Sequence, residues 1–403
     1  WLLNIRGNDL PKTPQTLSWA IVPAEGHPQL FIERSKLDIE LQAYLTQFVD
    51  IQPIDEMMHH VSAKAEAGVF FLLDTSKTAQ AFAKAIEDSD GAYAKLSDPI
   101  VLPRALKNET EISGAFAAHR RDGSAMCKFL CWLDAQKPGE MDEITCAETL
   151  EACRRDTGES LGSPLMDIAF DTISAAGPNA ALPHYRVTRE TNRTLNEGEI
   201  YLVDSGAQYL DGTTDITRTV AIGTVDDVKR DRFTRVLKGH IAVQTARFPK
   251  GTNGAALDSF ARHSLWQAGL DFAHGTGHGV GSYMSVHEGP QNISSRSRVA
   301  FQPGMITSNE PGYYKEGAFG IRIENLELTT EAEPIEGGDI AMLGFNTLTL
   351  CPIDRRLILV DMLSDSELHW LNDYHARVAM ELSPLLEGDV LTWLERATAP
   401  LLR

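Results

Sequence analysis

The sequence predicts an α/β domain over residues 1–104 followed by an α+β domain over residues 105–403. Up to about residue 103, short apolar stretches alternate with helix-like segments, the rhythm typical of an α/β domain. A Pro-punctuated stretch then leads into two long helical segments followed by Gly- and Pro-rich strands, which favours an α+β domain with an antiparallel working sheet. The 403 residues, 43% of them hydrophobic, are enough for more than one core.

In the first domain we expect strands in "WLLNIRG", "LSWAIVP", "QLFIE" and "GVFFLLD" and a helix in "TSKTAQAFAKAIED". No group of residues suited to catalysis is found there. The second domain is expected to begin with a helix capped by Asn108, with Glu111 three residues later, that runs to about Gln136. A second helix is predicted from about Asp142 to Thr157.

The rest of the second domain is predicted to be strands from about Asp167 to Arg356, with a C-terminal helical extension from about residue 350. In that extension Ser364 and Glu367 form a predicted capping box. The helix that follows has one apolar face, which predicts docking within the chain or at a dimer contact, formed by Leu368, Leu371, Val378 and Leu382.

Composition excludes several classes of partner. The formal net charge of −19 opposes binding to nucleic acid or to an anionic membrane. Apolar runs such as "VFFLL" are far shorter than the ~20 residues that span a bilayer, so we expect a cytoplasmic protein without membrane contact. The five cysteines contain no Cys-x-x-Cys pair and are expected to be reduced core residues.

Two carboxylates stand out in "YLVDSGAQYLDGTTDITRT", residues 201–219. Asp204 and Asp215 lie on two predicted strands joined by a Gly-containing turn, so the strands should pair. Acids on a buried strand face are costly unless something compensates their charge, and metal ions do so. Asp211, directly before Gly212, is interpreted as an ordinary turn residue.

Three further segments carry side chains that bind metals. "HGTGHGVG" contains His274 and His278, "SNEPGYY" contains Glu310, and "GIRIEN" contains Glu324. The glycine string lacks the G-K-S/T and the G-x-G-x-x-G spacing of nucleotide loops. Glycines on both sides of His278 instead allow close approach of the backbone, which places the imidazole in a crowded pocket.

Counting ligands indicates two divalent cations, because four carboxylates (Asp204, Asp215, Glu310, Glu324) and one imidazole (His278) balance two ions with bridging carboxylates. The oxygen-rich set favours manganese, with cobalt, magnesium or zinc as alternatives. Such a pair would hold a bridging hydroxide, a strong nucleophile at neutral pH.

The motifs "YLVDSGAQYLDGTTDITRT", "HGTGHGVG", "VHEGP", "NEPGYY" and "GIRIEN", in that order, resemble those of the pita-bread metallopeptidases of family M24, and most closely the aminopeptidase P (Xaa-Pro aminopeptidase) group. The resemblance covers residues 104–403 and implies a pita-bread catalytic domain. Residues 1–103 resemble the creatinase-like middle domain of three-domain, cytosolic-type members. Those members carry another domain upstream, so we expect that segment to be missing from this chain.

The resemblance also implies roles for individual residues. Asp204 would bind one metal, Asp215 and Glu324 would bridge the pair, and His278 and Glu310 would complete the second site, with Glu310 also acting as general acid/base. The family's substrate-contacting histidines match His184 in "LPHY", His274 and His287 in "VHEGP". Tyr314 and Arg322 match positions that brace the carboxylates, whereas His119, His240 and His263 match no motif and are interpreted as structural.

The implied activity is hydrolysis of the N-terminal Xaa-Pro bond of peptides with proline at the second position, by a homodimer. A prolidase that cleaves Xaa-Pro dipeptides shares the fold and all five ligand types and stays open as an alternative. Methionine aminopeptidase is disfavoured by the extra first domain. A non-catalytic pita-bread binding protein is disfavoured because such proteins lose metal ligands, and all five are present here.

Overall fold

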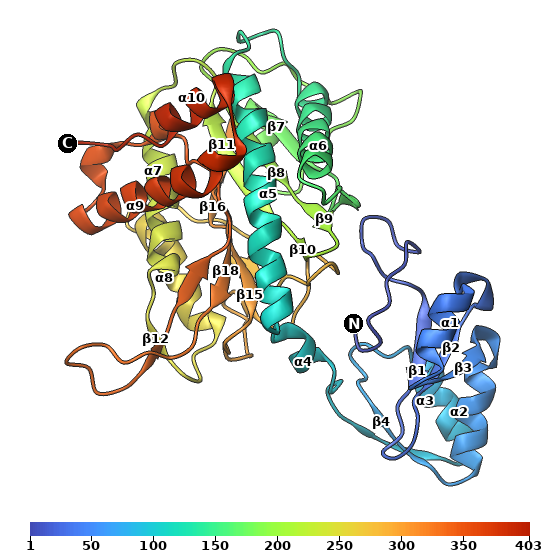
Figure 1. Cartoon of the computed structure of the whole chain (residues 1–403). Coiled ribbons are helices and arrows are strands. Elements are labelled where there is room, and N and C mark those ends of the chain that lie inside the picture. The colour runs from blue at the N-terminus through green and yellow to red at the C-terminus, as the bar shows by residue number, and fades with distance from the viewer. The chain divides into compact units, whose positions relative to one another are not determined.

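The computed structural model describes all of residues 1–403 and divides into two compact units, Trp1–Arg104 and Ala105–Arg403. None of its helices combines the length and the apolar character needed to cross a membrane. Figure 1 shows the chain coloured from its N-terminus to its C-terminus, with the helices and strands of each unit labelled.

The N-terminal unit is α/β, as predicted. In it β1 pairs antiparallel with β2, while the pairs β2–β3 and β4–β5 are parallel. Helices pack on these strands through a core that includes Phe31, Val61 and Phe82. The strands are β1 Ser18–Ile21, β2 Gln29–Ile32, β3 Asp50–Pro53, β4 Phe70–Leu73 and β5 Ala92–Lys95, and the helices are α1 Ile39–Leu45, α2 Met57–Glu66 and α3 Gln80–Asp88. The short helix α4, Val101–Ala105, follows them.

The predicted first strand "WLLNIRG" is wrong, because Trp1–Gly7 pairs with no strand. Asn4 has a left-handed backbone (φ 51°) and its N–H donates to the Trp1 carbonyl, which closes a turn. The apolar residues Leu3 and Ile5 pack instead against the cluster that contains Leu30 and Leu45. Their hydrophobic pattern therefore reports packing against a core rather than sheet formation.

The C-terminal unit contains two antiparallel three-stranded sheets that matter for the site, in the orders β11-β8-β7 and β15-β18-β20. In Figure 1 its strands lie between the helices α5 and α6 on one side and α7 and α8 on the other. The main strands are β6 Asp167–Ile168, β7 Ile173–Ala176, β8 Ile200–Ser205, β9 Ala207–Tyr209, β10 Gly212–Thr213, β11 Ile216–Ala221, β13 Gly277–His278, β14 Asn292–Ile293, β15 Ile306–Asn309, β16 Gly312–Lys315, β17 Phe319–Arg322, β18 Asn325–Thr329 and β20 Phe345–Thr347. The short β12 Phe248–Pro249 pairs with β19 Met342–Leu343.

The helices of this unit follow the capping signals of the sequence. The Asn108 side chain accepts from Glu111 N in a capping box at the start of α5, and Ser364 and Glu367 form another at the start of α9. Leu371, one of the residues predicted on the apolar face of α9, is fully buried. The helices are α5 Glu109–Asp134, α6 Glu143–Ser160, α7 Asp227–Gln244, α8 Gly254–Trp266, α9 Asp365–Leu382 and α10 Gly388–Ala397.

The expectation of strands throughout residues 167–356 is wrong in one respect, since α7 and α8 interrupt them. Asp226 caps α7 by accepting from Lys229 N, and Asn253 caps α8 by accepting from Ala255 N. Apolar residues at helical spacing along α7, such as Phe233 and Leu237, face the strands. The Gly- and Pro-rich surroundings conceal this signal in the sequence.

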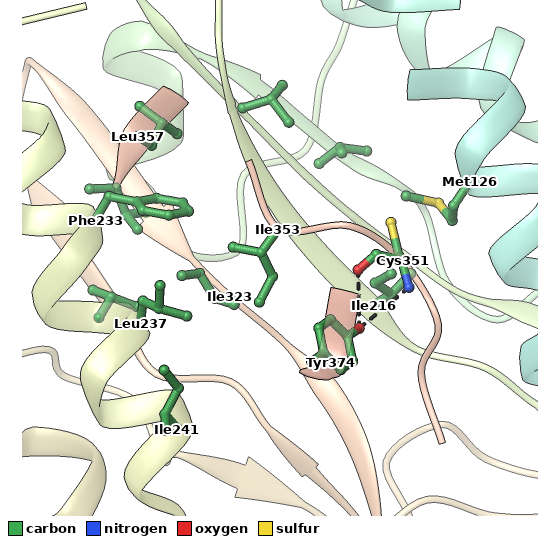
Figure 2. Close-up of a cluster of buried hydrophobic side chains, with 14 of the residues drawn as sticks. Met126, Ile216, Phe233, Leu237, Ile241, Ile323, Cys351, Ile353, Leu357 and Tyr374 are labelled. Carbon is green, nitrogen blue, oxygen red and sulfur yellow. Dashed lines mark hydrogen bonds between the residues drawn. The ribbon is translucent and has the colours of Figure 1, made fainter. Parts of the chain in front are cut away.

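The large core of the C-terminal unit fixes the strands relative to these helices. Figure 2 shows Phe233, Leu237 and Ile241 of α7 directed toward Ile323 and Ile353, and each of these five side chains is at most 3% exposed. Burying a side chain of this size contributes about 1.5–3 kcal/mol. Because successive residues of an extended chain point to opposite faces, the core position of Ile323 directs its neighbours away from the core.

Candidate metal centre

The register of β8 and β11 brings the first two predicted ligands to one face of the sheet. Asp204 lies directly opposite Thr217, and Asp215 stands two residues before Thr217, just ahead of β11. Side chains two apart on a strand share a face, as do directly paired residues. The predicted pairing of these strands is therefore confirmed, and Thr217 joins the two acids on that face.

The remaining ligand candidates come from strand ends. His278 closes β13, Glu310 directly follows β15, and Glu324 lies between β17 and β18. A Cβ on Gly277 would lie 1.8 Å from the Ser308 carbonyl oxygen, so only glycine permits this approach. The close backbone packing that the glycine string predicted is thus present beside His278.

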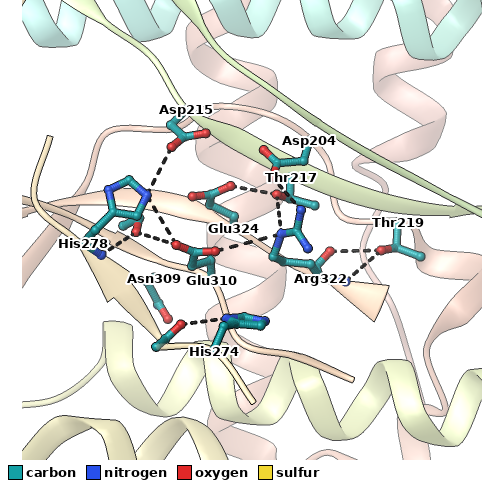
Figure 3. Close-up of polar contacts among 12 residues, drawn as sticks. Asp204, Asp215, Thr217, Thr219, His274, His278, Asn309, Glu310, Arg322 and Glu324 are labelled. Carbon is teal, nitrogen blue, oxygen red and sulfur yellow. Dashed lines mark hydrogen bonds and ion pairs between the residues drawn. The ribbon is translucent and has the colours of Figure 1, made fainter. Parts of the chain in front are cut away.

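All five predicted ligands converge in Figure 3, where Asp215, Glu324 and Glu310 surround the His278 ring. Asp204, Asp215 and Glu324 have ligand atoms within 4.8 Å of one another, and so do His278, Glu310 and Glu324. The Nε2 atom of His278 is 3.5 Å from Asp215 Oδ2 and 3.4 Å from Glu310 Oε1. The two groups share Glu324, an arrangement suited to two cations with a bridging carboxylate.

Hydrogen bonds to protein atoms orient these ligands. The His278 Nδ1 lies 3.0 Å from the Gly279 carbonyl oxygen, so Nδ1–H donates there and Nε2 keeps its lone pair for a metal. The Ser308 hydroxyl donates to Glu310 Oε1 at 3.1 Å and accepts from His278 N at 2.9 Å. The Thr217 hydroxyl donates to Glu324 Oε2 at 2.7 Å.

The sequence motifs did not identify Thr217 and Ser308. Each lies two residues from a predicted ligand, Thr217 after Asp215 and Ser308 before Glu310. The strand period of two places such residues on the same face as the ligand, and that period was the available signal.

Arg322 and Tyr314 brace the opposite side of the centre, as the resemblance implied. Arg322 Nη2 donates to Asp204 Oδ2 at 2.5 Å, and its Nη1 donates to the Tyr314 hydroxyl at 2.7 Å. Since a guanidinium only donates, that hydroxyl donates in turn to His274 Nε2, 2.8 Å away. His274 Nδ1 then donates to the Gly275 carbonyl at 2.7 Å, so both nitrogens of this ring are engaged.

The other two predicted histidines lie at the solvent side. His184 and His287 are exposed, and the His287 ring centroid is 4.0 Å from that of His278. The side chains of His278 and Glu310 are 21% and 17% exposed, whereas Asp215 and Glu324 are almost fully buried. The centre is therefore open to solvent on the side of His278 and Glu310.

Electrostatics test whether the residues fit metal ions. Burial, together with the charges of neighbouring carboxylates, raises the pKa of Asp215 and Glu324 well above their ordinary values. Burial also raises the pKa of Glu310. The Oδ1 atoms of Asp204 and Asp215 are buried and accept no hydrogen bond from the protein. Unpartnered buried oxygens and crowded carboxylates fit divalent cations, which would supply the missing partners.

Comparison with known proteins places this centre in a family. The model of metallopeptidase family M24 matches residues 115–331, that of the C-terminal region of peptidase M24 matches residues 341–401, and that of the creatinase/prolidase N-terminal domain matches residues 1–111. The chain is 42% identical over 424 residues to a probable Xaa-Pro aminopeptidase P of Tuber melanosporum, covering 100% of this chain and 67% of the relative. It is 40% identical to aminopeptidase P2 of Arabidopsis thaliana, covering 100% of this chain and 60% of that protein.

Solved structures show the same likeness. An X-prolyl aminopeptidase of Caenorhabditis elegans, described as a cytosolic enzyme with a di-nuclear active site, superposes with a TM-score of 0.91 at 36% identity, covering 100% of this chain and 66% of that one. An Xaa-Pro dipeptidase of Bacillus anthracis shares the fold at 24% identity, with a TM-score of 0.66, covering 84% of this chain and 88% of that one. This chain thus spans 60% to 67% of the length of its aminopeptidase relatives. The chain belongs to metallopeptidase family M24, as its matched domains, its converging ligands and these relatives show.

Proposed function

We propose that this chain is the catalytic portion of a metal-dependent aminopeptidase that hydrolyses the N-terminal Xaa-Pro bond of peptides. The observation that carries the proposal is the pair of ligand groups that share Glu324, in a chain 42% identical to a probable Xaa-Pro aminopeptidase P. Asp204, Asp215 and Glu324 would hold one ion, and His278, Glu310 and Glu324 the other. When bound, the two ions polarise the substrate carbonyl and make a water nucleophilic at neutral pH.

Glu310 is the proposed general acid/base. Its Oε1 atom is engaged by Ser308 and faces His278, whereas Oε2 is 3.9 Å from Arg322 Nε and is the freer oxygen. Oε2 is therefore the oxygen placed to take a proton from the attacking water and to pass it on. The nitrogen of a departing proline needs such a proton.

His184 and His287 are the proposed contacts to the substrate carbonyls. Desolvation by the groups packed around its ring, together with the neighbouring rings of His278 and His184, lowers the pKa of His287 to about 4 although the residue is exposed at the surface, so its ring is neutral at pH 7 and can donate one N–H. Because both nitrogens of His274 are already engaged, we propose that this residue acts by holding the Tyr314 hydroxyl.

This arrangement suits proline. An Xaa-Pro bond is a tertiary amide without an N–H, so a site that grips the backbone N–H of its substrate loses that contact. Activation of the carbonyl and protonation of the leaving nitrogen by Glu310 need no N–H. The free amine of the substrate, bound at the centre, would limit cleavage to the first residue.

Three finer properties belong to the same proposal. Manganese is the proposed metal because the donor set is rich in oxygen. A cytoplasmic location is proposed because the C. elegans relative is described as cytosolic. A homodimer is proposed from the family resemblance alone, since the apolar face of α9 packs within the chain and gives no support to a dimer contact. Light scattering and metal analysis of the purified protein test the dimer and the metal.

The experiment that tests the activity is mass-spectrometric analysis of products after manganese loading. An Xaa-Pro-Xaa tripeptide, an Xaa-Pro dipeptide and a proline-free tripeptide are run side by side, with Glu310→Gln as the inactive control. Release of the first residue from the Xaa-Pro-Xaa peptide alone supports an aminopeptidase. Strong preference for the dipeptide would make the protein a prolidase, and no turnover with no bound metal would make it a binding protein.

A further inference from the structure

A second buried polar cluster lies behind the metal centre and contains none of its ligands. Each member is at most 5% exposed, and the members come from five different elements: Asn309 of β15, His240 of α7, Asn325 of β18, Arg218 of β11 and Tyr374 of α9. Hydrogen bonds join its members to one another. We call this set the His240 cluster.

The cluster is placed at the last rung of a strand pair. Asn309 and Asn325 are register partners, and they form the final pair of the β15–β18 ladder. Asn309 directly precedes Glu310, and Asn325 directly follows Glu324. Beyond this rung the same register continues, with Ile323 N donating to the Pro311 carbonyl oxygen at 3.3 Å and Gly312 paired with Arg322, so Glu310 and Glu324 stand opposite each other between two paired stretches.

His240 spans this rung. Its Nδ1 lies 3.0 Å from the Asn309 carbonyl oxygen, and its Nε2 lies 3.2 Å from Asn325 Nδ2. The Asn309 side chain returns a bond, from Nδ2 to the His240 carbonyl oxygen at 2.9 Å. One imidazole therefore holds the residues adjacent to Glu310 and Glu324.

The direction of each bond follows from Arg218. Its Nη2 donates to Asn325 Oδ1 at 2.9 Å, which turns the Asn325 amide nitrogen toward His240. His240 Nε2 must then accept, and Nδ1–H must donate to Asn309. Burial, followed by the charge of Arg218, lowers the pKa of His240 to about 3, which agrees with a neutral ring.

Arg218 also ties the cluster to the ligand backbone and to the C-terminal helix. Its Nη1 donates to the Glu324 carbonyl oxygen at 2.7 Å, and its Nη2 lies 3.0 Å from the Tyr374 hydroxyl of α9. A continuous chain of hydrogen bonds therefore starts at Tyr374 of α9 and ends at Asn309, the residue before Glu310. It passes through Arg218, Asn325 and His240.

We propose that His240 is a positioning residue for the metal centre. In its neutral Nδ1–H form it holds Asn309 and Asn325, and so fixes the side of the strand pair on which Glu310 and Glu324 directly border them. It touches neither the ligands nor the substrate. The inference rests on the proposed two-metal function. Partners of metal ligands typically change metal affinity by about 10- to 100-fold when they are removed.

The test compares His240→Leu with His375→Leu. His375 of α9 is also fully buried, and its Nε2 accepts from Ile353 N at 3.1 Å, away from the ligands. Metal-free protein is titrated with Mn²⁺ by calorimetry, and the absorption spectrum of bound Co²⁺ reports ligand geometry. Both variants should melt at a lower temperature than the parent. Only His240→Leu should bind metal about 10- to 100-fold more weakly and change the Co²⁺ spectrum.

Unchanged affinity and spectrum in folded His240→Leu would overturn the inference, and so would equal losses in both variants. If His240→Leu does not fold, His240→Asn replaces it, because its shorter amide does not span both partners; parental affinity there also overturns the inference. A parent protein that binds no metal would instead refute the proposed function. The two failures are therefore distinguishable.

Discussion

Replacing Thr217 by valine removes one hydroxyl from the wall of the metal centre while nearly keeping the shape of the side chain. Thr217 is fully buried, donates to Glu324 Oε2 at 2.7 Å and accepts from Arg322 Nε at 3.2 Å. The variant leaves Glu324 without its hydroxyl donor. Thr217→Val should therefore weaken metal binding.

The size of the effect follows from the charge of Glu324 in each state. Without metal, burial and the neighbouring carboxylates raise the pKa of Glu324 well above its ordinary value, which favours the neutral carboxyl, whereas a metal-bound carboxylate is ionised. A hydrogen bond to a charged group contributes about 1.5–3 kcal/mol and one to a neutral group about 0.5–1.5 kcal/mol. The difference of about 1–1.5 kcal/mol corresponds to roughly 5- to 12-fold weaker metal binding.

The chain offers a matched control in Thr347→Val. The Thr347 hydroxyl donates to Glu327 Oε2 at 2.8 Å, and both residues are buried in the β15-β18-β20 sheet. Titration of metal-free protein with Mn²⁺ should show roughly tenfold weaker binding for Thr217→Val and parental binding for Thr347→Val. Chemical denaturation should show a loss of about 1–3 kcal/mol in the free energy of unfolding for each variant. Parental metal affinity in Thr217→Val, or an equal loss in both, would refute the reasoning.

Three further outcomes are expected. Asp215→Asn should abolish hydrolysis and lower bound metal while circular dichroism stays parental; normal turnover would contradict its place as a ligand. Because burial and neighbouring carboxylates raise the pKa of Asp215 and Glu324, metal binding should release protons and tighten as pH rises. Calorimetry in buffers of different ionisation enthalpy measures that release. A binding enthalpy that does not depend on the buffer would contradict the expected proton release. Burial raises the pKa of Glu327 from 4.5 to about 8, so its contribution to stability is full below about pH 4.5 and is lost as pH rises through about 8. The melting temperature of Glu327→Gln should therefore rise relative to the parent between these pH values, and a constant difference would argue against this pKa.

The chemistry of the centre could be predicted from the sequence because it depends on residue type and local order. Asp204 lies on β8 and Asp215 just before β11, and these two paired strands are joined through the short β9–β10 hairpin, which keeps the two acids close together. The glycines beside His278 reported a close backbone approach, and the capping residues Asn108 and Ser364 marked helix starts. All of these signals act over a few residues or across one turn.

Sequence period alone misjudged two regions. The apolar residues of Trp1–Gly7 pack on a core without joining a sheet, and α7 was hidden among Gly- and Pro-rich strands. An apolar pattern reports which side chains are buried, and it does not report what the backbone pairs with.

By itself, the sequence determined which side chains gather at the candidate metal centre and in what order they occur along the chain. Only the tertiary structure decided how those side chains are held, because their supports come from distant segments. Arg322 reaches Asp204 across 118 residues, and His240 joins Asn309 and Asn325 across 69 and 85 residues. No local pattern encodes such contacts, since they arise only when α7 packs on the sheet and the buried polar atoms must find partners.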